Sequence, residues 1–226
     1  TFRAYLASPG DAPLTTPGSG KCNVAGGPSS PCDILDVSVL RRALESLAPG
    51  IADTCTAQYG TSGNVVRFAA FGAQGKGNQG QLDVAAELRE TCLERCCDFV
   101  QLLGNNVFDN GVNSTSDPQW AEKFEVPYAA VDLPFWAVLG NHDYGGANPA
   151  DPFFGFDPLK GQTQVDYSAT VSTKFEMPAL YWQRSVAHVQ FFGFDSTRTL
   201  LSQDAQQRTD VDAWLDSSTA SWRISA

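Results

Sequence analysis

The distribution of hydrophobic residues changes near residue 64. Residues 1–63 are dense in Gly, Pro and Ser, in stretches such as "PGDAPLTTPGSG" and "NVAGGPSSP", which favour loops. Within them, residues 34–47 have the apolar spacing of one helix face. The residues on that face are Leu35, Val39, Leu40, Leu44 and Leu47. We expect residues 1–63 to form a loop-rich, cysteine-containing N-terminal extension with one amphipathic helix, and residues 64–226 to form a separate domain.

From residue 64 onward, apolar runs alternate with helical patterns. The runs "NVVRFAAFG", "FVQLLGNN", "LPFWAVLG" and "AHVQFFGFD" predict four strands. Residues 79–98 and 207–219 predict helices, and "EKFEVPY" predicts a short helical stretch or turn. In the first helix the expected inward residues are Leu82, Ala85, Ala86, Leu93 and Cys97. Buried strands that alternate with helices indicate βαβ units and an α/β fold with a covered sheet.

Polar residues follow the predicted strands at once. The four strand ends read "FGAQG", "LGNNVF", "LGNHD" and "FGFDS". In open α/β sheets the functional loops follow the carboxyl ends of the strands. Asn141 and His142 are residue types that bind metals or transfer protons, so the candidate chemistry lies at these ends.

Charge and hydropathy exclude several classes of partner. The 226-residue chain has a formal net charge of −10 and a pI of about 4.5. Nucleic acids and anionic lipids attract basic surfaces, so neither is an expected partner. No apolar run approaches the roughly 18 residues that a membrane span needs, and we expect no transmembrane segment.

The cysteines indicate an oxidising compartment. There are six, at positions 22, 32, 55, 92, 96 and 97, and their spacing matches no zinc motif. Disulfides are favoured over buried thiols, although the pairing cannot be deduced from sequence. The chain begins at Thr1, as a mature chain does after removal of a targeting segment, and it contains the N-glycosylation sequon Asn113-Ser114-Thr115. We expect a secreted, cell-surface or organelle-lumen protein.

The four strand ends, in this order, resemble those of the calcineurin-like metallophosphoesterases, and most of all the purple acid phosphatase branch. "CDFVQLLGNNVFDNGV" is similar to that branch's second motif, and "LPFWAVLGNHDY" to its third. "KFEMPALYW" and "FFGFDST" resemble two further stretches. The resemblance covers about residues 64–226. It implies a two-sheet core flanked by helices, with two bridged metal ions at the strand ends. Such a pair lowers the pKa of a bound water and holds the phosphate oxygens, and a neighbouring His protonates the leaving group.

The resemblance also assigns positions, and several have lost their ligands. Ala73 stands where the family has a metal-binding Asp, Asn105 where it has the bridging Asp, and Phe108 where it has an iron-binding Tyr. Asn141 matches a metal ligand, His142 the catalytic His, and Asp143 a carboxylate that often orients that His. The family's remaining ligands are histidines in later segments. His188 matches none of them, and we expect it to be a packed or solvated strand residue.

These losses predict a vestigial site. Asn141 and Asn105 alone would compensate poorly for the dehydration of two divalent cations, so we expect no cofactor. If the chain is active, the expected cofactor is a binuclear iron, zinc or manganese centre. The "LGNHD" turn then has a structural role, since Asn tolerates a left-handed turn and Asp bonds nearby N–H groups. The alternative is that Asn141 and His142 bind a phosphate-like anion without metal.

Two hypotheses about function follow. The first is a non-catalytic, purple-acid-phosphatase-like scaffold or interaction subunit of a larger assembly. On this hypothesis the domain lacks its last strands, and a protein partner covers the incomplete sheet. The second is a metal-dependent phosphomonoesterase whose site is completed by residues beyond 226. In that enzyme Asn141 would bind metal, Asn105 would assist and His142 would be the general acid.

Overall fold

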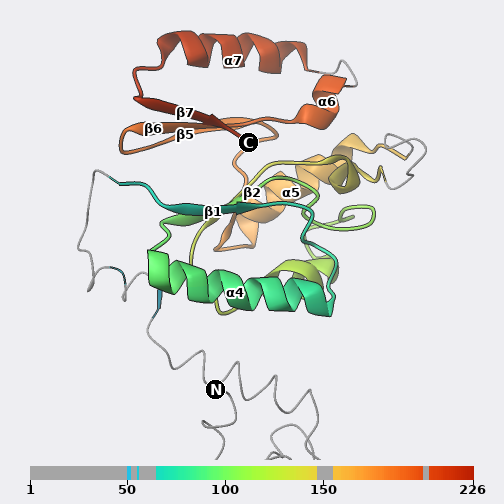
Figure 1. Ribbon diagram of the computed structural model, residues 1–226. Coiled ribbons are helices and arrows are strands. Elements are labelled where there is room, and N and C mark those ends of the chain that lie inside the picture. Colours follow the sequence, from blue (N-terminus) through green and yellow to red (C-terminus); the bar gives the residue numbers. More distant parts are fainter. Residues whose placement is uncertain (1–49, 52–54, 56–64, 147–154, 201–203) are drawn as a thin grey trace, which may run out of the picture. The chain divides into compact units, whose positions relative to one another are not determined.

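The computed structural model describes residues 50–51, 55, 65–146, 155–200 and 204–226 (Figure 1). The chain divides into two units, residues 1–49 and 50–226, and the described residues all belong to the second. The helix expected at residues 34–47 lies outside the described residues, as do Cys22 and Cys32.

The first sheet has four parallel strands. In order they are β1 (Phe68–Phe71), β2 (Phe99–Leu102), β3 (Phe135–Ala137) and β4 (Phe175–Glu176). Its register places Phe68 beside Phe99 and Val100 beside Phe135. Because β2 and β3 are buried at every position, they form the continuous apolar runs seen in the sequence. The first three predicted strands and the α/β class are confirmed, and β4 was not predicted.

The second sheet has three strands of mixed direction. They are β5 (Trp182–Val186), β6 (Val189–Gly193) and β7 (Trp222–Ser225), with β6 in the middle. Strands β5 and β6 pair antiparallel, and β6 and β7 pair parallel. The predicted strand that began at residue 187 begins at Val189, because Ala187 and His188 form the turn between β5 and β6. His188 is therefore a half-buried turn residue and not a strand residue.

Helices cover the outer faces of both sheets. The α-helices are α4 (Gln79–Arg95), α5 (Pro158–Thr170), α6 (Ser196–Leu200) and α7 (Ala205–Ser217). A π-helical turn, η1 (Ala121–Glu125), and a 3-10 turn, η2 (Asn141–Tyr144), complete the described elements. Helix α4 lies against the first sheet and α7 against the second (Figure 1). None of the described helices combines the length and the apolar composition needed to cross a bilayer.

Helix α4 exists as predicted, but its inward face differs. Asn78 caps its N-terminus by accepting a hydrogen bond from the Gln81 N–H at 3.1 Å. Gln81 points inward, where its Nε2 donates to the Lys123 carbonyl at 2.6 Å and its Oε1 accepts from the Gly77 N–H at 2.7 Å. These bonds satisfy a buried amide, and the prediction that Leu82 points inward is wrong, since Leu82 is 37% exposed.

Aromatic side chains fill the space between the two sheets. Phe191 of β6 packs edge-on against Phe68 and Phe99, with ring centroids 5.2 Å apart in each pair. Trp182 of β5 packs edge-on against Trp136 of β3 at 6.1 Å. Buried aromatic pairs of this kind dominate the energetics of a core. These contacts also show how the two sheets stack: β5 lies over β3, and β6 lies over β1 and β2.

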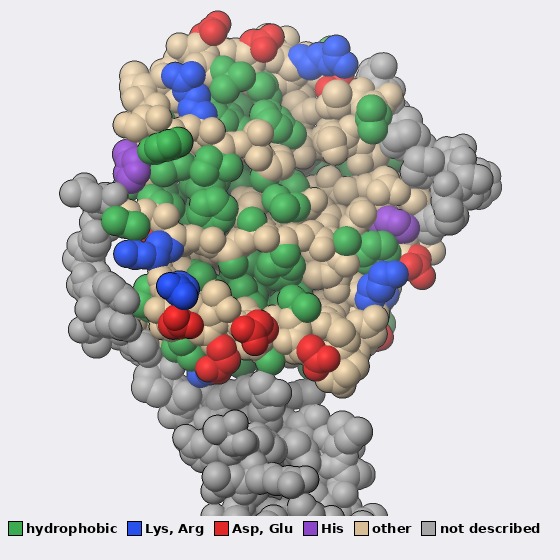
Figure 2. Space-filling view, in the orientation of Figure 1, with side chains coloured by type: hydrophobic (Ala, Val, Ile, Leu, Met, Phe, Trp, Pro, Cys, Tyr) green, Lys and Arg blue, Asp and Glu red, His purple; other side chains and the backbone are tan. Residues whose placement is uncertain are grey.

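Among the residues that the structure describes, one side of the two-sheet core is open, because no strand lies beyond β1 or β7. Since β6 already lies over β1, the next strand, β7, extends past the edge of the first sheet. Ile224 of β7 packs against the core, and Trp222, two residues earlier on the same face, is 65% exposed. Strands β1 and β7 are both edge strands, and hydrophobic side chains gather in the middle of the face along which they run (Figure 2).

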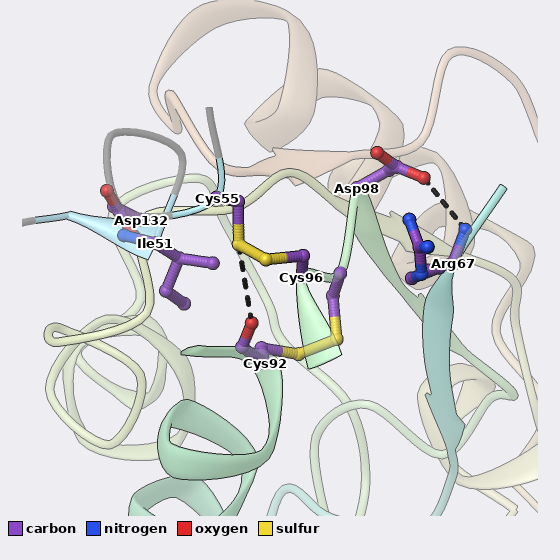
Figure 3. The surroundings of a disulfide bond; sticks show 8 residues. Ile51, Cys55, Arg67, Cys92, Cys96, Asp98 and Asp132 are labelled. Atoms are coloured by element: carbon purple, nitrogen blue, oxygen red, sulfur yellow. Dashed lines mark hydrogen bonds between the residues drawn. A yellow bond between two sulfur atoms is a disulfide. The ribbon is translucent and has the colours of Figure 1, made fainter. Parts of the chain in front are cut away.

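Two disulfides hold the C-terminal end of α4. Cys92 bonds to Cys97, and Cys55 bonds to Cys96 across a sequence separation of 41 residues (Figure 3). Nearby, the backbone N–H of Ile51, which is 1% exposed, donates to the Asp132 carboxylate at 3.0 Å. Residues 51 and 55 thus join the core of the domain, although they precede the expected boundary at residue 64. Such disulfides are typical of proteins in oxidising compartments.

Candidate functional site

The turns that follow β1, β2 and β3 touch one another. The Ala73 N–H donates to the Gly104 carbonyl at 2.9 Å, which joins the first two turns. A Cβ on Gly104 would lie 2.9 Å from the Gly140 nitrogen, so only Gly allows the second and third turns to approach so closely. The parallel strands therefore bring together the residues after β1, β2 and β3, as the sequence predicted. The fourth predicted strand end, after β6, belongs to the other sheet.

Ala73 and Asn105 both adopt left-handed backbone conformations, with φ of 59° and 55°. Ala73 is exposed and offers no ligand atom. Asn105 is half-buried, and its Oδ1 accepts a hydrogen bond from the His142 N–H at 3.0 Å. The Asn105 side-chain oxygen thus fixes the turn after β3.

The His142 ring is oriented by a backbone carbonyl. Its Nδ1 lies 2.7 Å from the Asp109 carbonyl oxygen, and because a carbonyl only accepts, Nδ1 carries the proton. The ring packs on Phe108 with centroids 4.4 Å apart. The Lys76 ammonium lies 4.5 Å from the Phe108 ring centroid. The Phe108 ring therefore lies in contact with both the His142 ring and the Lys76 ammonium.

Asp143 lies inside the fold, with 0% of its surface exposed. Its carboxylate accepts the N–H groups of Asn106 at 2.8 Å, Val107 at 3.1 Å and Gly140 at 2.9 Å. The Gln164 side chain donates to it at 2.9 Å. Burial raises the pKa of the Asp143 carboxyl, and the bonds from Gly140, Gln164, Asn106 and Val107 act in the opposite direction. Asp143 therefore ties the turns after β2 and β3 to α5. The His142 ring is hydrogen-bonded to the Asp109 carbonyl and not to the Asp143 carboxylate.

Asn141 bonds to its own turn. Its Nδ2 donates to the Gly146 carbonyl at 2.8 Å, and its side chain is half-buried. The bond spans five residues and closes the 3-10 turn η2. Asn141 therefore stabilises the loop in which the "GNHD" sequence lies.

Basic side chains brace the loop after β2. Three consecutive carbonyls, those of residues 108–110, each accept a hydrogen bond from a basic side chain. The pairs are Lys123 with Phe108, His142 with Asp109, and Lys160 with Asn110. These three side chains lie near the strand ends, but their hydrogen-bonding capacity is partly used by the loop itself.

Four residues for which the sequence predicted no role complete this network: Asn106, Gln164, Tyr144 and Asp195. Asn106 is buried, and its Nδ2 donates to Val138 and Gln164. Tyr144, fully buried, donates its hydroxyl to the buried Asp195 after β6. The repeated Asn in "GNNVF" and the Asp in "FGFDS" were signals of such roles. Through Tyr144 and Asp195 the "GNHDY" and "FGFDS" segments meet, although they follow strands of different sheets.

The donor set does not fit a binuclear metal centre. Ala73 and Phe108 have no ligand atoms, the Asn105 oxygen accepts a backbone N–H, and the Asp143 carboxylate is committed to four donors. Two divalent cations require anionic oxygen ligands or several neutral imidazoles. In the part of the chain that the structure describes, no three His, Cys, Asp or Glu side chains are grouped as a metal site requires.

The chain is similar in sequence to several known proteins. The chain is 39% identical to purple acid phosphatase 3 of Arabidopsis thaliana over 84 residues, which are 36% of this chain and 23% of that protein. It is 34% identical to purple acid phosphatase 4 of the same plant over 128 residues, 52% of this chain and 38% of that protein. It is 30% identical to glideosome-associated protein 50 of Plasmodium falciparum over 132 residues, 54% of this chain and 33% of that protein.

The coverage is partial in each case. The matches span roughly a quarter to two fifths of the length of these relatives, and no family model matches the chain. A solved structure described as "GAP50 the anchor in the inner membrane complex of Plasmodium" is 25% identical to this chain, with a TM-score of 0.47. It covers 67% of this chain, and the match covers 48% of that structure's chain.

Proposed function

We propose that this chain, a distant homologue of the purple acid phosphatases in the metallophosphoesterase superfamily, is a non-catalytic scaffold or interaction subunit of a larger assembly. It functions in an oxidising compartment: a secretory space, a cell surface or an organelle lumen. The two disulfides at the end of α4 support that location.

One observation carries the proposal. At the three positions where the resemblance places phosphatase ligands, this chain has Ala73, Asn105 and Phe108. The side chains of Asn105 and Phe108 make structural contacts there. Ala73 bonds through its backbone to Gly104, Asn105 caps the His142 N–H, and Phe108 packs on the His142 ring. Position 73 has no side-chain ligand, and the side chains at positions 105 and 108 contact the His142 turn. This combination favours a turn kept for its shape over a metal site.

The open side of the core supports a protein partner. In a parallel sheet, every second residue of a strand hydrogen-bonds to the strand on one side, and the residues between them face the other side. Along β7 the N–H groups of Trp222 and Ala226 bond to β6. The backbone groups of Arg223 and Ser225 therefore face the free edge of β7. We propose that a partner protein adds an extended segment to β7 and covers Trp222. A second copy of the chain is disfavoured, because each copy carries a net charge of −10.

A relative's name supports the same class of role. Glideosome-associated protein 50, which shares 30% identity with this chain, is named for its association with an assembly. The other relatives in the comparison are named as phosphatases, so the choice between the two roles rests on the residues of this chain.

The catalytic part of the proposal is tested by phosphomonoester hydrolysis. We expect the protein purified from its source to hydrolyse an aryl phosphate no faster than its His142→Ala variant, with or without added iron, zinc or manganese. Hydrolysis at ordinary enzymatic rates that His142→Ala removes would overturn it.

The partner surface is tested by a matched pair of substitutions. Trp222→Lys places a charge on the open edge, and Leu159→Lys places one on α5, where Leu159 is 71% exposed. We expect Trp222→Lys to reduce the size of the native particle toward that of one chain, and Leu159→Lys to leave it unchanged. A wild-type particle of single-chain mass, or equal effects of both variants, would contradict the proposed surface.

A second candidate function is a metal-dependent phosphomonoesterase whose site is completed by residues beyond 226. The observation that favours it is the orientation of His142, whose Nδ1 bonds to Asp109 and leaves Nε2 for a substrate. If this candidate is correct, the double variant Ala73→Asp, Asn105→Asp should bind metal more tightly and hydrolyse faster than the wild type. Unchanged metal binding and rate would exclude it.

A further inference from the structure

The sequence contains one N-glycosylation sequon, Asn113-Ser114-Thr115, which the proposed function does not use. It lies in the loop between β2 and η1. Asn113 and Ser114 are exposed, and Thr115 is half-buried. The middle residue is not Pro, so the sequon is of the accepted type.

The loop around the sequon is held by bonds that leave the Asn113 side chain outside. The Asn113 backbone N–H donates to the Asp117 carboxylate at 2.9 Å, and the Asp117 N–H donates to the Ser114 carbonyl at 3.2 Å. The indole of Trp120, which is 3% exposed, donates to the same Ser114 carbonyl at 3.2 Å. A buried Trp and an Asp-centred turn thus fix the backbone and present the Asn113 amide on the surface.

A second observation bears on whether the sequon is used. Asparagine glycosylation takes place in the same pathway in which disulfides form, and the domain contains Cys55–Cys96 and Cys92–Cys97. An exposed sequon is a weak signal in a reducing compartment, where it meets no glycosyl donor. It becomes a strong one in a chain whose fold includes disulfides.

We propose that Asn113 is an N-glycosylation site. The Nδ2 of Asn113 forms a bond to the anomeric carbon of a lipid-diphosphate-linked oligosaccharide. The bond from that carbon to the diphosphate oxygen breaks, and the lipid diphosphate leaves with the electron pair. The amide nitrogen loses one proton to a base of the transferase, and the Thr115 hydroxyl is the sequon's recognition group.

The position of the site gives the glycan a consequence. The same loop packs on the "GNHD" turn, since a Cβ on Gly111 would lie 2.2 Å from the Asp143 carbonyl oxygen. Its Asp109 carbonyl orients His142. A glycan on Asn113 therefore flanks the strand-end turns and crowds that face against a macromolecular partner. The β7 edge belongs to the other sheet.

The test uses the full chain, secreted from glycosylating eukaryotic cells with the Cys55–Cys96 and Cys92–Cys97 disulfides formed. The peptide that contains Asn113 is treated with an amide-hydrolysing glycosidase in ¹⁸O-labelled water and analysed by mass spectrometry. We expect labelled Asp at position 113 in the wild type and in Thr115→Ser, which keeps the sequon. We expect loss of the glycan in Asn113→Gln and Thr115→Ala.

Ser116→Ala, one residue beyond the sequon, is the matched control and should keep the glycan. Because the Asn113 side chain lies outside the loop's hydrogen bonds, Asn113→Gln should be secreted and should melt as the enzymatically deglycosylated wild type does. Unmodified Asn113 in secreted, disulfide-bonded wild type would overturn the proposal. That result would leave the proposed scaffold function untouched, since that function rests on other residues.

Discussion

The side chains at the strand ends stabilise the turns in which they lie. Asn105 accepts the His142 N–H, Asn141 donates to Gly146, and Asp143 accepts from three backbone groups and one side chain. A buried acceptor with all its donors in place is worth far more than the same group left unpaired. The "GNHD" sequence can therefore persist for structural reasons alone.

Replacement of Asp143 tests this role. Asp143→Asn keeps the shape but turns one acceptor oxygen into a donor that faces N–H groups, so we expect a loss of about 2–4 kcal/mol in the free energy of unfolding. The measurement is urea denaturation. Asp109→Asn is the control, because Asp109 is exposed and acts through its carbonyl, and its effect should stay within about 0.5 kcal/mol. Equal effects of the two variants would contradict a structural role for the Asp143 carboxylate.

The sequence located the site residues but not their contacts. The position of Asn105, Asn141 and His142 after parallel strands places them at one edge of a sheet, and the structure brings them together. That Asp143 would face Asn106 and Gln164 could not be predicted, because the contact with Gln164 depends on a helix with no clear sequence signal. The roles of these residues in catalysis or metal binding stay predictions.

Elements with an apolar period were predicted, and those without one were missed. The inward residues of α5 are Gly161, Gln164 and Tyr167, which show no hydrophobic repeat. The strands β4, β5 and β7 are short or half-exposed, so their apolar content is low. The inward position of Gln81 in α4 was missed for the same reason, because Gln81 is not apolar. Its hydrogen-bonded amide points inward, where Leu82 was expected.

Gly161 in α5 gives a prediction that opposes helix propensity. Ala is a better helix former than Gly by roughly 1 kcal/mol, but a Cβ at position 161 would lie 2.4 Å from a Tyr144 ring carbon. We expect Gly161→Ala to destabilise the protein by about 1–3 kcal/mol because the clash outweighs the propensity. Gly80→Ala in α4 is the control, since its nearest neighbour is 3.5 Å away, and it should stabilise slightly. Thermal melting of both variants decides, and stabilisation by Gly161→Ala would show that α5 does not pack tightly on Tyr144.

At the scale of the whole molecule, buried tyrosines make stability sensitive to alkali. Burial raises the pKa of Tyr128 to about 12. Burial also raises the pKa values of Tyr144 and Tyr167, with further contributions from Asp195 and Glu125 respectively. The folded pKa of each exceeds the unfolded value near 10, so the stabilisation is fully present below pH 10. It is lost as the pH rises through the folded pKa, because the unfolded chain releases its protons first.

We therefore expect the free energy of unfolding to fall between pH 10 and 12, with roughly 2–3 kcal/mol of the loss from Tyr128 alone. The measurement is denaturant unfolding at several pH values, with tyrosinate absorbance recorded in parallel. The absorbance of the buried tyrosines should appear together with unfolding. Full titration of all tyrosines in a protein that keeps its native circular dichroism would contradict this prediction.

The parallel sheet, the second sheet and the distant homology to purple acid phosphatases confirm the fold class and the resemblance that the sequence indicated. The fold does not determine the function, because proteins that share one fold can have different functions. The proposed scaffold role rests on a few turn residues, and the metal content of the protein tests that proposal most directly.

That measurement is the elemental metal content per chain of the protein purified from its source without chelators. Because Ala73, Asn105 and Phe108 provide no anionic ligand, we predict iron, zinc and manganese far below one equivalent per chain. Two equivalents of such metals, retained through dialysis, would contradict the proposed scaffold role and would favour the metal-dependent phosphomonoesterase.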